Sequence, residues 1–163
     1  MRKLTATLCL TAAVLLGSAG MSWSADFQTG LDAYNRVDYI TALQEWTPLA
    51  EQGDADAQYN LGLMYDKGDG VPQDYKTTVK WYTLAAEQGH APAQTSLGLM
   101  YHNGYGVVKD FVRAYMWYNL ATSQGEKDAT ENRDIVAKKM TSADVSKAKD
   151  LARECVKKNY KGC

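Results

Sequence analysis

Apolar residues in the middle of the chain recur with the period of amphipathic helices, and polar residues fill the positions between them. At 100° per residue, one face of the first such segment gathers Ala57, Leu61, Met64, Tyr65 and Gly68. A second helix is expected to run from Asp74 to a stop at Gly89. Its packing residues are Trp81, Tyr82 and Ala85. The pattern predicts a pair of helices, each with one face that must be buried.

This helix pair occurs twice in the sequence. A shift of 36 residues places residues 54–89 over residues 90–125, and half of the positions are then identical. A partial copy over residues 38–53 falls in the same register. One helix pair cannot bury its apolar faces alone, so neighbouring pairs are expected to stack into a solenoid. Gly62 and Gly98 stand inside helices, where glycine is unfavourable, which indicates close contact between helices.

The segment DKGDG, from Asp66 to Gly70, has the composition of a calcium loop or of a phosphate-binding turn. The second copy replaces both aspartates, by His102 and Tyr105, and keeps both glycines. Calcium needs six to eight oxygen ligands, which the second copy does not offer. The segment is therefore interpreted as a turn between helices, in which glycine adopts a positive φ.

The first unit is a variant of this helix pair, and capping helices follow the last repeat. In the first pair, residues 25–53, a short turn replaces the long glycine loop, and Pro48 should kink the second helix. After residue 125, helices are expected over 127–140 and 142–158, the second with a capping sequence at Thr141. The expected buried face of that last helix consists of Val145, Ala148, Ala152, Cys155 and Val156.

Residues 1–24 are interpreted as a cleaved secretory signal, with Arg2 and Lys3 before an apolar run and a cut before Ala25. A lipid anchor at Cys9 is the alternative, but this cysteine comes too early to follow a full apolar region. Cleavage leaves 16 basic and 19 acidic residues, a net charge of −3. This balance gives no reason to expect nucleic acid or an anionic membrane as a partner. The remaining 139 residues fit one domain.

Cys155 and Cys163 are the two cysteines that remain after cleavage. In an oxidising compartment such a pair near the end of a chain indicates a disulfide. A catalytic cysteine pair and a metal site are the alternatives. The spacing does not fit the first, and the two histidines, His90 and His102, lie far away in sequence.

No group of residues has the spacing of a known catalytic centre. Asp54 and Asp56 are close in sequence, but acidic residues before a helix usually stabilise its N-terminus. His90 stands at the start of a helix and is expected to be exposed. We therefore expect no enzymatic activity, no metal and no cofactor.

The repeated pattern A-x-x-x-L-G-x-x-Y-x-x-G-x-G-V-x-x-D-Y/F, followed by W-Y-x-x-A and Q-G, resembles the Sel-1-like repeat, a relative of the tetratricopeptide repeat. The first pair resembles the shorter tetratricopeptide form, and residues 126–163 resemble the helical end that follows the last repeat. The resemblance implies an all-α fold, a right-handed α-α superhelix. Two residues depart from the pattern: Thr78 replaces a small alanine and Glu45 replaces tryptophan, which leaves the packing of the early helices open.

The resemblance also implies a non-enzymatic adaptor that binds a protein or peptide through the concave surface formed by the first helix of each pair. The positions that it places there are Tyr59, Leu63, Asp66, Thr95, Leu99 and His102. Leu63 and Leu99 either line this groove or pack against a neighbouring helix. A periplasmic or secreted monomer is expected. A cell-envelope hydrolase or ligand-modifying protein is the alternative function, and a self-associating structural protein is a third.

Overall fold

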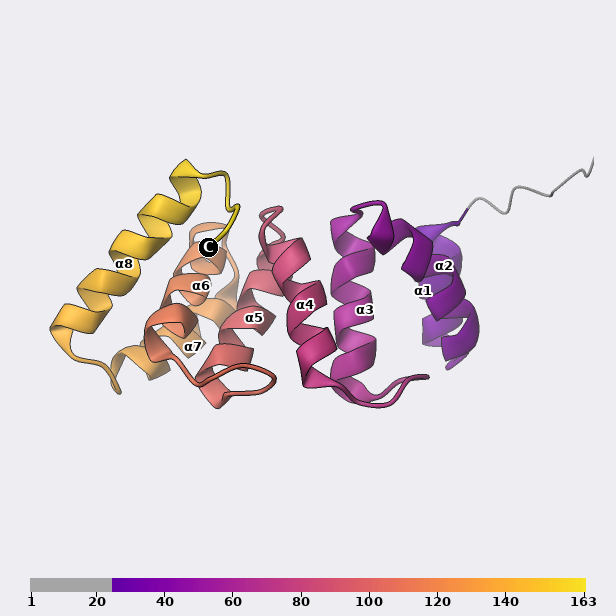
Figure 1. The fold of residues 1–163 in the computed structure, drawn as a ribbon, viewed down its shortest axis with the longest axis horizontal. Coiled ribbons are helices and arrows are strands. Elements are labelled where there is room, and N and C mark those ends of the chain that lie inside the picture. The colour runs from indigo at the N-terminus through magenta and orange to yellow at the C-terminus, as the bar shows by residue number, and fades with distance from the viewer. Residues whose placement is uncertain (1–24) are drawn as a thin grey trace, which may run out of the picture.

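The computed structural model describes residues 25–163, so the predicted signal and Cys9 lie outside the described residues. Within this range every regular element is a helix, which confirms the all-α prediction. The helices are α1 (Phe27–Asn35), α2 (Tyr39–Glu51), α3 (Ala55–Lys67), α4 (Tyr75–Ala86), α5 (Ala91–Asn103), α6 (Phe111–Ser123), α7 (Lys127–Ala137) and α8 (Ser142–Lys157). They follow one another along the long axis, from α1 and α2 at one end to α8 at the other (Figure 1).

Short polar side chains fix where the helices begin. Five helices begin after an aspartate whose side chain accepts a hydrogen bond from a backbone N–H in the first turn. These aspartates are Asp26 for α1, Asp38 for α2, Asp54 for α3, Asp74 for α4 and Asp110 for α6. Thr141 and Asp144 form a reciprocal capping box at the start of α8, as the sequence predicts. These caps satisfy amides that have no partner inside the helix.

The glycine loops end the first helix of each repeat, as predicted. Gly68 and Gly104 follow α3 and α5 with φ of +79° and +80°, in the left-handed region that glycine tolerates best. Asp69, one of the calcium-ligand candidates, accepts a hydrogen bond of 2.6 Å from the Tyr34 hydroxyl. The segment DKGDG is therefore a turn whose second aspartate binds the preceding helix pair.

The second glycine of each loop has a role that the sequence did not indicate. A Cβ at Gly70 would lie 2.5 Å from the Cβ of Tyr39, and one at Gly106 would overlap the carbonyl oxygen of Tyr75. Tyr39 and Tyr75 are the first residues of α2 and α4. Each loop thus touches the second helix of the preceding pair, and the missing side chain permits this contact.

Glycines inside the first helices allow close helix packing, which confirms the prediction for Gly62 and Gly98. A Cβ at Gly62 would lie 2.5 Å from the ring of Tyr82, and one at Gly98 would lie 2.7 Å from the ring of Tyr118. Gly30 of α1 is covered in the same way by Trp46 of α2. An aromatic ring therefore packs closely against a glycine in each of the first three pairs.

A ladder of glutamines joins successive pairs. Gln58 donates to the Ala50 carbonyl at 2.9 Å and accepts from Gln88 at 2.8 Å. One repeat later, Gln94 donates to Ala86 at 3.2 Å and accepts from Gln124 at 2.8 Å. Gln58 and Gln94 are buried, so these bonds satisfy carbonyl groups that water cannot reach.

The two departures from the repeat pattern are both accommodated in the early helices. Thr78 is fully buried, and its hydroxyl donates to the Asp74 carbonyl at 3.0 Å within the same helix. Glu45 is buried as well and accepts a 2.8 Å hydrogen bond from the backbone N–H of Asp26. Glu45 thereby holds the start of the first pair. Helix α2 continues through Pro48, and the kink expected there stays a prediction.

The C-terminal helices differ from the prediction in two details. Helix α7 ends at Ala137, whereas the sequence indicated a helix to residue 140. In α8, Ala148, Ala152 and Cys155 are buried, but Val156 is 49% exposed, so its assignment to the buried face was wrong. The reason is that Val156 lines an open groove between α6 and α8 rather than a closed contact.

The structure confirms a disulfide between Cys155 and Cys163, whose Cα atoms are 5.5 Å apart. The tail that it closes lies against the turn between α4 and α5. The backbone N–H of Gly162 donates to Glu87 at 2.9 Å, and a Cβ at Gly89 would lie 3.2 Å from the Tyr160 ring. The disulfide therefore ties α8 to a tail that contacts the turn between α4 and α5.

We expect Cys163→Ser to lower the free energy of unfolding by about 2 to 3 kcal/mol, because the unfolded chain loses a covalent loop constraint. Urea unfolding followed by circular dichroism measures this change. A reducing agent should produce the same shift in the wild type and none in the variant. Equal unfolding midpoints for wild type and variant would show that the disulfide does not contribute to stability.

Candidate protein-binding surface

An apolar residue stands at the same position in three successive first helices. Leu63, Leu99 and Ile135 are spaced by 36 residues and lie on α3, α5 and α7. Leu99 is 42% exposed and Ile135 is 46% exposed. Leu63 is half-buried and packs partly against the core cluster that contains Tyr82 and Leu97. We refer to these three residues as the apolar stripe.

Helix geometry turns Leu99 away from the core of its own pair. Leu97 and Met100 are buried, and at 100° per residue Leu99 lies 200° from Leu97. Ile135 was missed in the sequence analysis because the glycine loop and the tryptophan that mark a repeat are absent after residue 125. The signal that reveals it is the register itself: Ala129 and Val136 are buried, like Ala93 and Met100 one repeat earlier.

Tyr59 lies between two rings rather than in open solvent. Its ring centroid is 5.7 Å from that of Tyr82 and 4.9 Å from that of His90. Thr95 is also partly buried, and its hydroxyl donates to the Ala91 carbonyl at 3.1 Å. Both residues therefore serve the packing and the local bonding of the helices as well as any binding surface.

His90 is 15% exposed, so the prediction that it is exposed was wrong. Its Nδ1 accepts the backbone N–H of Ala93 at 3.1 Å and caps α5, while its Nε2 lies 3.0 Å from Asp56. An Nδ1 that accepts leaves the proton on Nε2, which then donates to the carboxylate. Both ring nitrogens are occupied, so His90 has no free nitrogen for proton transfer to a substrate. Asp54 caps α3, as predicted.

Asp66 lies in the last turn of α3, in the same helix pair as Tyr82 of α4. Burial raises the pKa of its carboxyl group, and the neighbouring Lys67 partly opposes this shift. Burial, together with the charge of Asp66, also raises the pKa of the Tyr82 hydroxyl. Asp66 is thus close enough to Tyr82 to act on it electrostatically, and it remains half-buried.

His102 lies where α5, the start of α6 and the turn between α7 and α8 meet. Its ring is 5.6 Å from that of Phe111, and its Nε2 is 3.2 Å from the Lys139 ammonium. Burial lowers the pKa of the imidazole, and the charges of Lys139 and Lys109 lower it further. His102 is therefore neutral at neutral pH. Its Nδ1 is buried and has no hydrogen-bond partner among the described residues.

The structure thus places the six predicted surface residues in different environments. Leu99 is an exposed apolar contact, and Ile135 joins it. Tyr59, Leu63 and His102 lie largely in seams between helices. Across residues 25–163, no cluster of three or more His, Cys, Asp or Glu side chains is arranged to hold a metal ion. None of the helices in this range is both long and apolar enough to cross a membrane.

Comparison with known proteins agrees with the repeat architecture. The Sel1 repeat family matches residues 55–90 and 91–126. The chain is a Sel1 repeat protein. Each matched unit contains one pair of the helices described above, α3 with α4 and α5 with α6. Sel1 repeats generally form scaffolds for protein interaction.

Two solved structures show the same repeat fold. One is c5321, a protective antigen present in uropathogenic Escherichia coli strains that displays an SLR fold, with 30% identity and a TM-score of 0.75 over 80% of this chain and 30% of that one. The other is a Sel1 repeat protein from Oxalobacter formigenes, with 36% identity and a TM-score of 0.64 over 66% of this chain and 44% of that one. This chain spans less than half of either structure. No curated protein matches its sequence.

Proposed function

We propose that this Sel1 repeat protein is an exported, non-enzymatic adaptor that binds an extended segment of a partner protein along the apolar stripe. The observation that carries the proposal is the exposure of Leu99 and Ile135 at equivalent positions of α5 and α7, in line with Leu63 of α3. Single exposed apolar residues are common on protein surfaces. Exposed apolar residues that recur at the repeat spacing are uncommon, and this recurrence suits a partner that runs across successive helices.

The chemistry of the surface favours binding over catalysis. Asp54 and His90 are both helix caps, and the second nitrogen of His90 is bonded to Asp56 of α3. No observation favours the hydrolase or ligand-modifying alternative. The stripe instead offers apolar contact area, the kind of residue that provides anchors in protein interfaces when it is enclosed by a partner.

Export to the periplasm or the outside is supported by two features of the sequence. Residues 1–24 have the composition of a secretory signal, and the disulfide between Cys155 and Cys163 suits an oxidising compartment. The mass of the purified native protein tests this part of the proposal. A chain that begins at Ala25 is the expected result, and an unprocessed chain in the cytoplasm would contradict it.

The binding part is tested with the double variant Leu99→Asp, Ile135→Asp. Both side chains are exposed, so the variant should fold, whereas Leu63 contributes to packing and is left unchanged. The protein and the variant are used to capture partners from an exported-protein extract, and the affinity of each purified partner is then measured. We expect the double variant to bind its partner at least about tenfold more weakly, because two anchors lose apolar contact and gain a charge.

The matched control is Leu84→Asp, Leu151→Asp. These leucines are 37% and 38% exposed and lie on α4 and α8, away from the stripe. The control should keep full affinity and the same circular dichroism spectrum. Equal binding by the stripe variant and the wild type would refute the stripe as the binding surface.

A further inference from the structure

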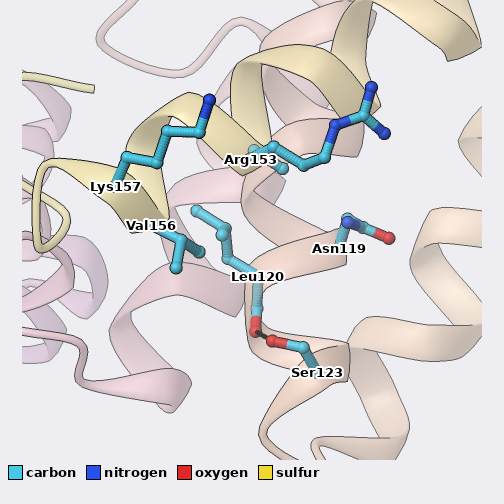
Figure 2. A pocket seen from close by; sticks show the side chains of 7 residues that line it. Asn119, Leu120, Ser123, Arg153, Val156 and Lys157 are labelled. Carbon is cyan, nitrogen blue, oxygen red and sulfur yellow. Dashed lines mark hydrogen bonds between the residues drawn. The ribbon is translucent and has the colours of Figure 1, made fainter.

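A concave feature that the sequence analysis did not indicate lies between α6 and α8. It is a groove of about 340 Å³ lined by Asn119, Leu120, Ser123, Ala152, Arg153, Val156 and Lys157. Figure 2 shows Leu120 of α6 and Val156 of α8 facing each other, with Arg153 and Lys157 extending from α8. We refer to it as the C-terminal groove. Its volume is in the range of sites that hold ligands or anchoring side chains.

The groove is apolar at the bottom and positively charged at the rim. Leu120 and Ala152 are each 2% exposed and Val156 is 49% exposed, so Val156 is the apolar side chain that remains open to a partner. No acidic residue is among the seven that line the groove. A partner that enters therefore meets apolar contacts and two cations, Arg153 and Lys157.

The two cations are held only weakly in their present positions. Arg153 pairs with Asp150, and Lys157 pairs with Glu154, three residues earlier on the same helix in both cases. The paired side chains are between 56% and 70% exposed, and exposed pairs of this kind contribute little to stability. Little stabilising free energy is lost when either cation turns away from its pair toward a carboxylate of a partner.

Positive charge is also concentrated at the groove's end of the chain over residues 25–163. Residues 25–125 contain six basic and twelve acidic residues, whereas residues 126–163 contain ten basic and seven acidic ones. The repeats are therefore acidic and the C-terminal helices are basic. A positive end on an otherwise acidic protein favours the approach of acidic segments in one orientation.

The groove exists only where α8 packs on α6. Leu120 is 2% exposed, whereas Leu84, the equivalent residue of α4 one repeat earlier, is 37% exposed. Helix α8 is not a regular second helix, because it follows a short turn in place of the glycine loop. Its packing against α6 buries Leu120 together with Ala152 and leaves the groove beside Val156.

We propose that the C-terminal groove binds an acidic segment of a partner protein. One large apolar side chain of that segment lies against Val156, which packs beside the buried Leu120, and its flanking carboxylates bind Arg153 and Lys157. This site is independent of the apolar stripe, so the protein presents two binding surfaces on different helices. Such an arrangement allows one adaptor to hold two partners together.

The test is selection of random peptides displayed on phage against the purified protein. Peptides that bind the double variant Arg153→Glu, Lys157→Glu are removed first. We expect the enriched peptides to contain Asp or Glu next to Leu, Met or Phe. Synthetic peptides of this sequence should bind the variant about tenfold or more weakly than the wild type, and their binding should weaken with salt.

Three further variants make the result specific. Lys147→Glu, Lys149→Glu changes the net charge equally on another part of exposed α8 and should keep the affinity within twofold. Val156→Glu alters the bottom of the groove at an exposed position and should abolish binding. Leu99→Asp, Ile135→Asp should leave peptide binding unchanged, which separates this site from the stripe. Circular dichroism confirms the fold of each variant.

The proposal is overturned if no peptide is enriched, if the enriched peptides lack acidic residues, or if they bind the charge-reversed variant equally well. Sedimentation at increasing protein concentration adds one more decisive result. A self-association that disappears in Arg153→Glu, Lys157→Glu would assign the groove to a second copy of the chain instead of an acidic segment from a partner protein.

Discussion

Gly106→Ala is expected to destabilise the protein by about 3 kcal/mol or more, although it adds a single methyl group in a surface loop. Gly106 has a φ of +69°, a conformation that costs an L-residue about 1 to 2 kcal/mol. The added Cβ would also overlap the carbonyl of Tyr75 and lie 3.0 Å from the backbone nitrogen of Lys76. These are backbone atoms at the start of α4, so no side chain can rotate away. Overpacking of this kind costs about 1 to 3 kcal/mol.

Urea unfolding followed by circular dichroism measures this loss, and Gly125→Ala is the matched control. Gly125 also has a positive φ, +95°, but an added Cβ there has no neighbour within 4 Å. The control should therefore lose only the conformational contribution, about 1 to 2 kcal/mol. Equal losses for the two variants would show that the loop moves away from α4 at little cost.

The same contact explains how one repeat positions the next. The loop that contains Gly106 also places Tyr105 on Tyr75, with ring centroids 4.9 Å apart and nearly parallel planes. Gly106→Ala would separate these rings as well. The loop thus joins α5 to the start of α4, and its glycine is needed for the assembly of repeats as well as for the turn.

Trp117→Ala is expected to cost about 4 kcal/mol, the largest effect of a single side-chain truncation in the repeats. The side chain is 2% exposed and belongs to the core cluster that contains Leu97, Met100 and Cys155. Its removal leaves a large cavity between the second repeat and the C-terminal helices. Guanidinium unfolding with a two-state fit measures the change.

Trp81→Ala is the control because Trp81 stands at the equivalent position of the preceding repeat. Trp81 is only half-buried, packs at the edge of the core cluster that contains Trp46 and Leu61, and has the Lys80 ammonium 5.0 Å from its ring. Its truncation exposes less apolar surface and should cost roughly half as much. A greater loss for Trp81→Ala than for Trp117→Ala would contradict this assignment of the core.

The Leu63, Leu99 and Ile135 positions illustrate the limit of sequence analysis for the candidate site. Periodicity places Leu63 and Leu99 on the same helical face, but it does not say which of them a neighbouring helix covers. The structure leaves Leu99 open and half-buries Leu63 in the next pair. Ile135 lies in a unit without the loop and tryptophan of the repeat, so its equivalence became visible only through the packing of Ala129 and Val136.

What the sequence determined by itself is local or strictly periodic. The helix pairs, the aspartate caps, the glycine turn after Lys67 and the close contact at Gly62 follow from interactions within a few residues or from the 36-residue repeat. The pairing of Cys155 with Cys163 is also local, because few residues separate them.

The tertiary structure alone decided which equivalent side chains are buried. His90 is covered because Asp56 and Tyr59 of α3 reach it, and Val156 is open because α6 and α8 leave a groove beside it. Burial depends on the neighbour that a solenoid supplies at each position. Neighbours differ between the middle and the end of the array even where the sequence repeats, so exposure, and with it the binding surfaces, could not be predicted from the chain alone.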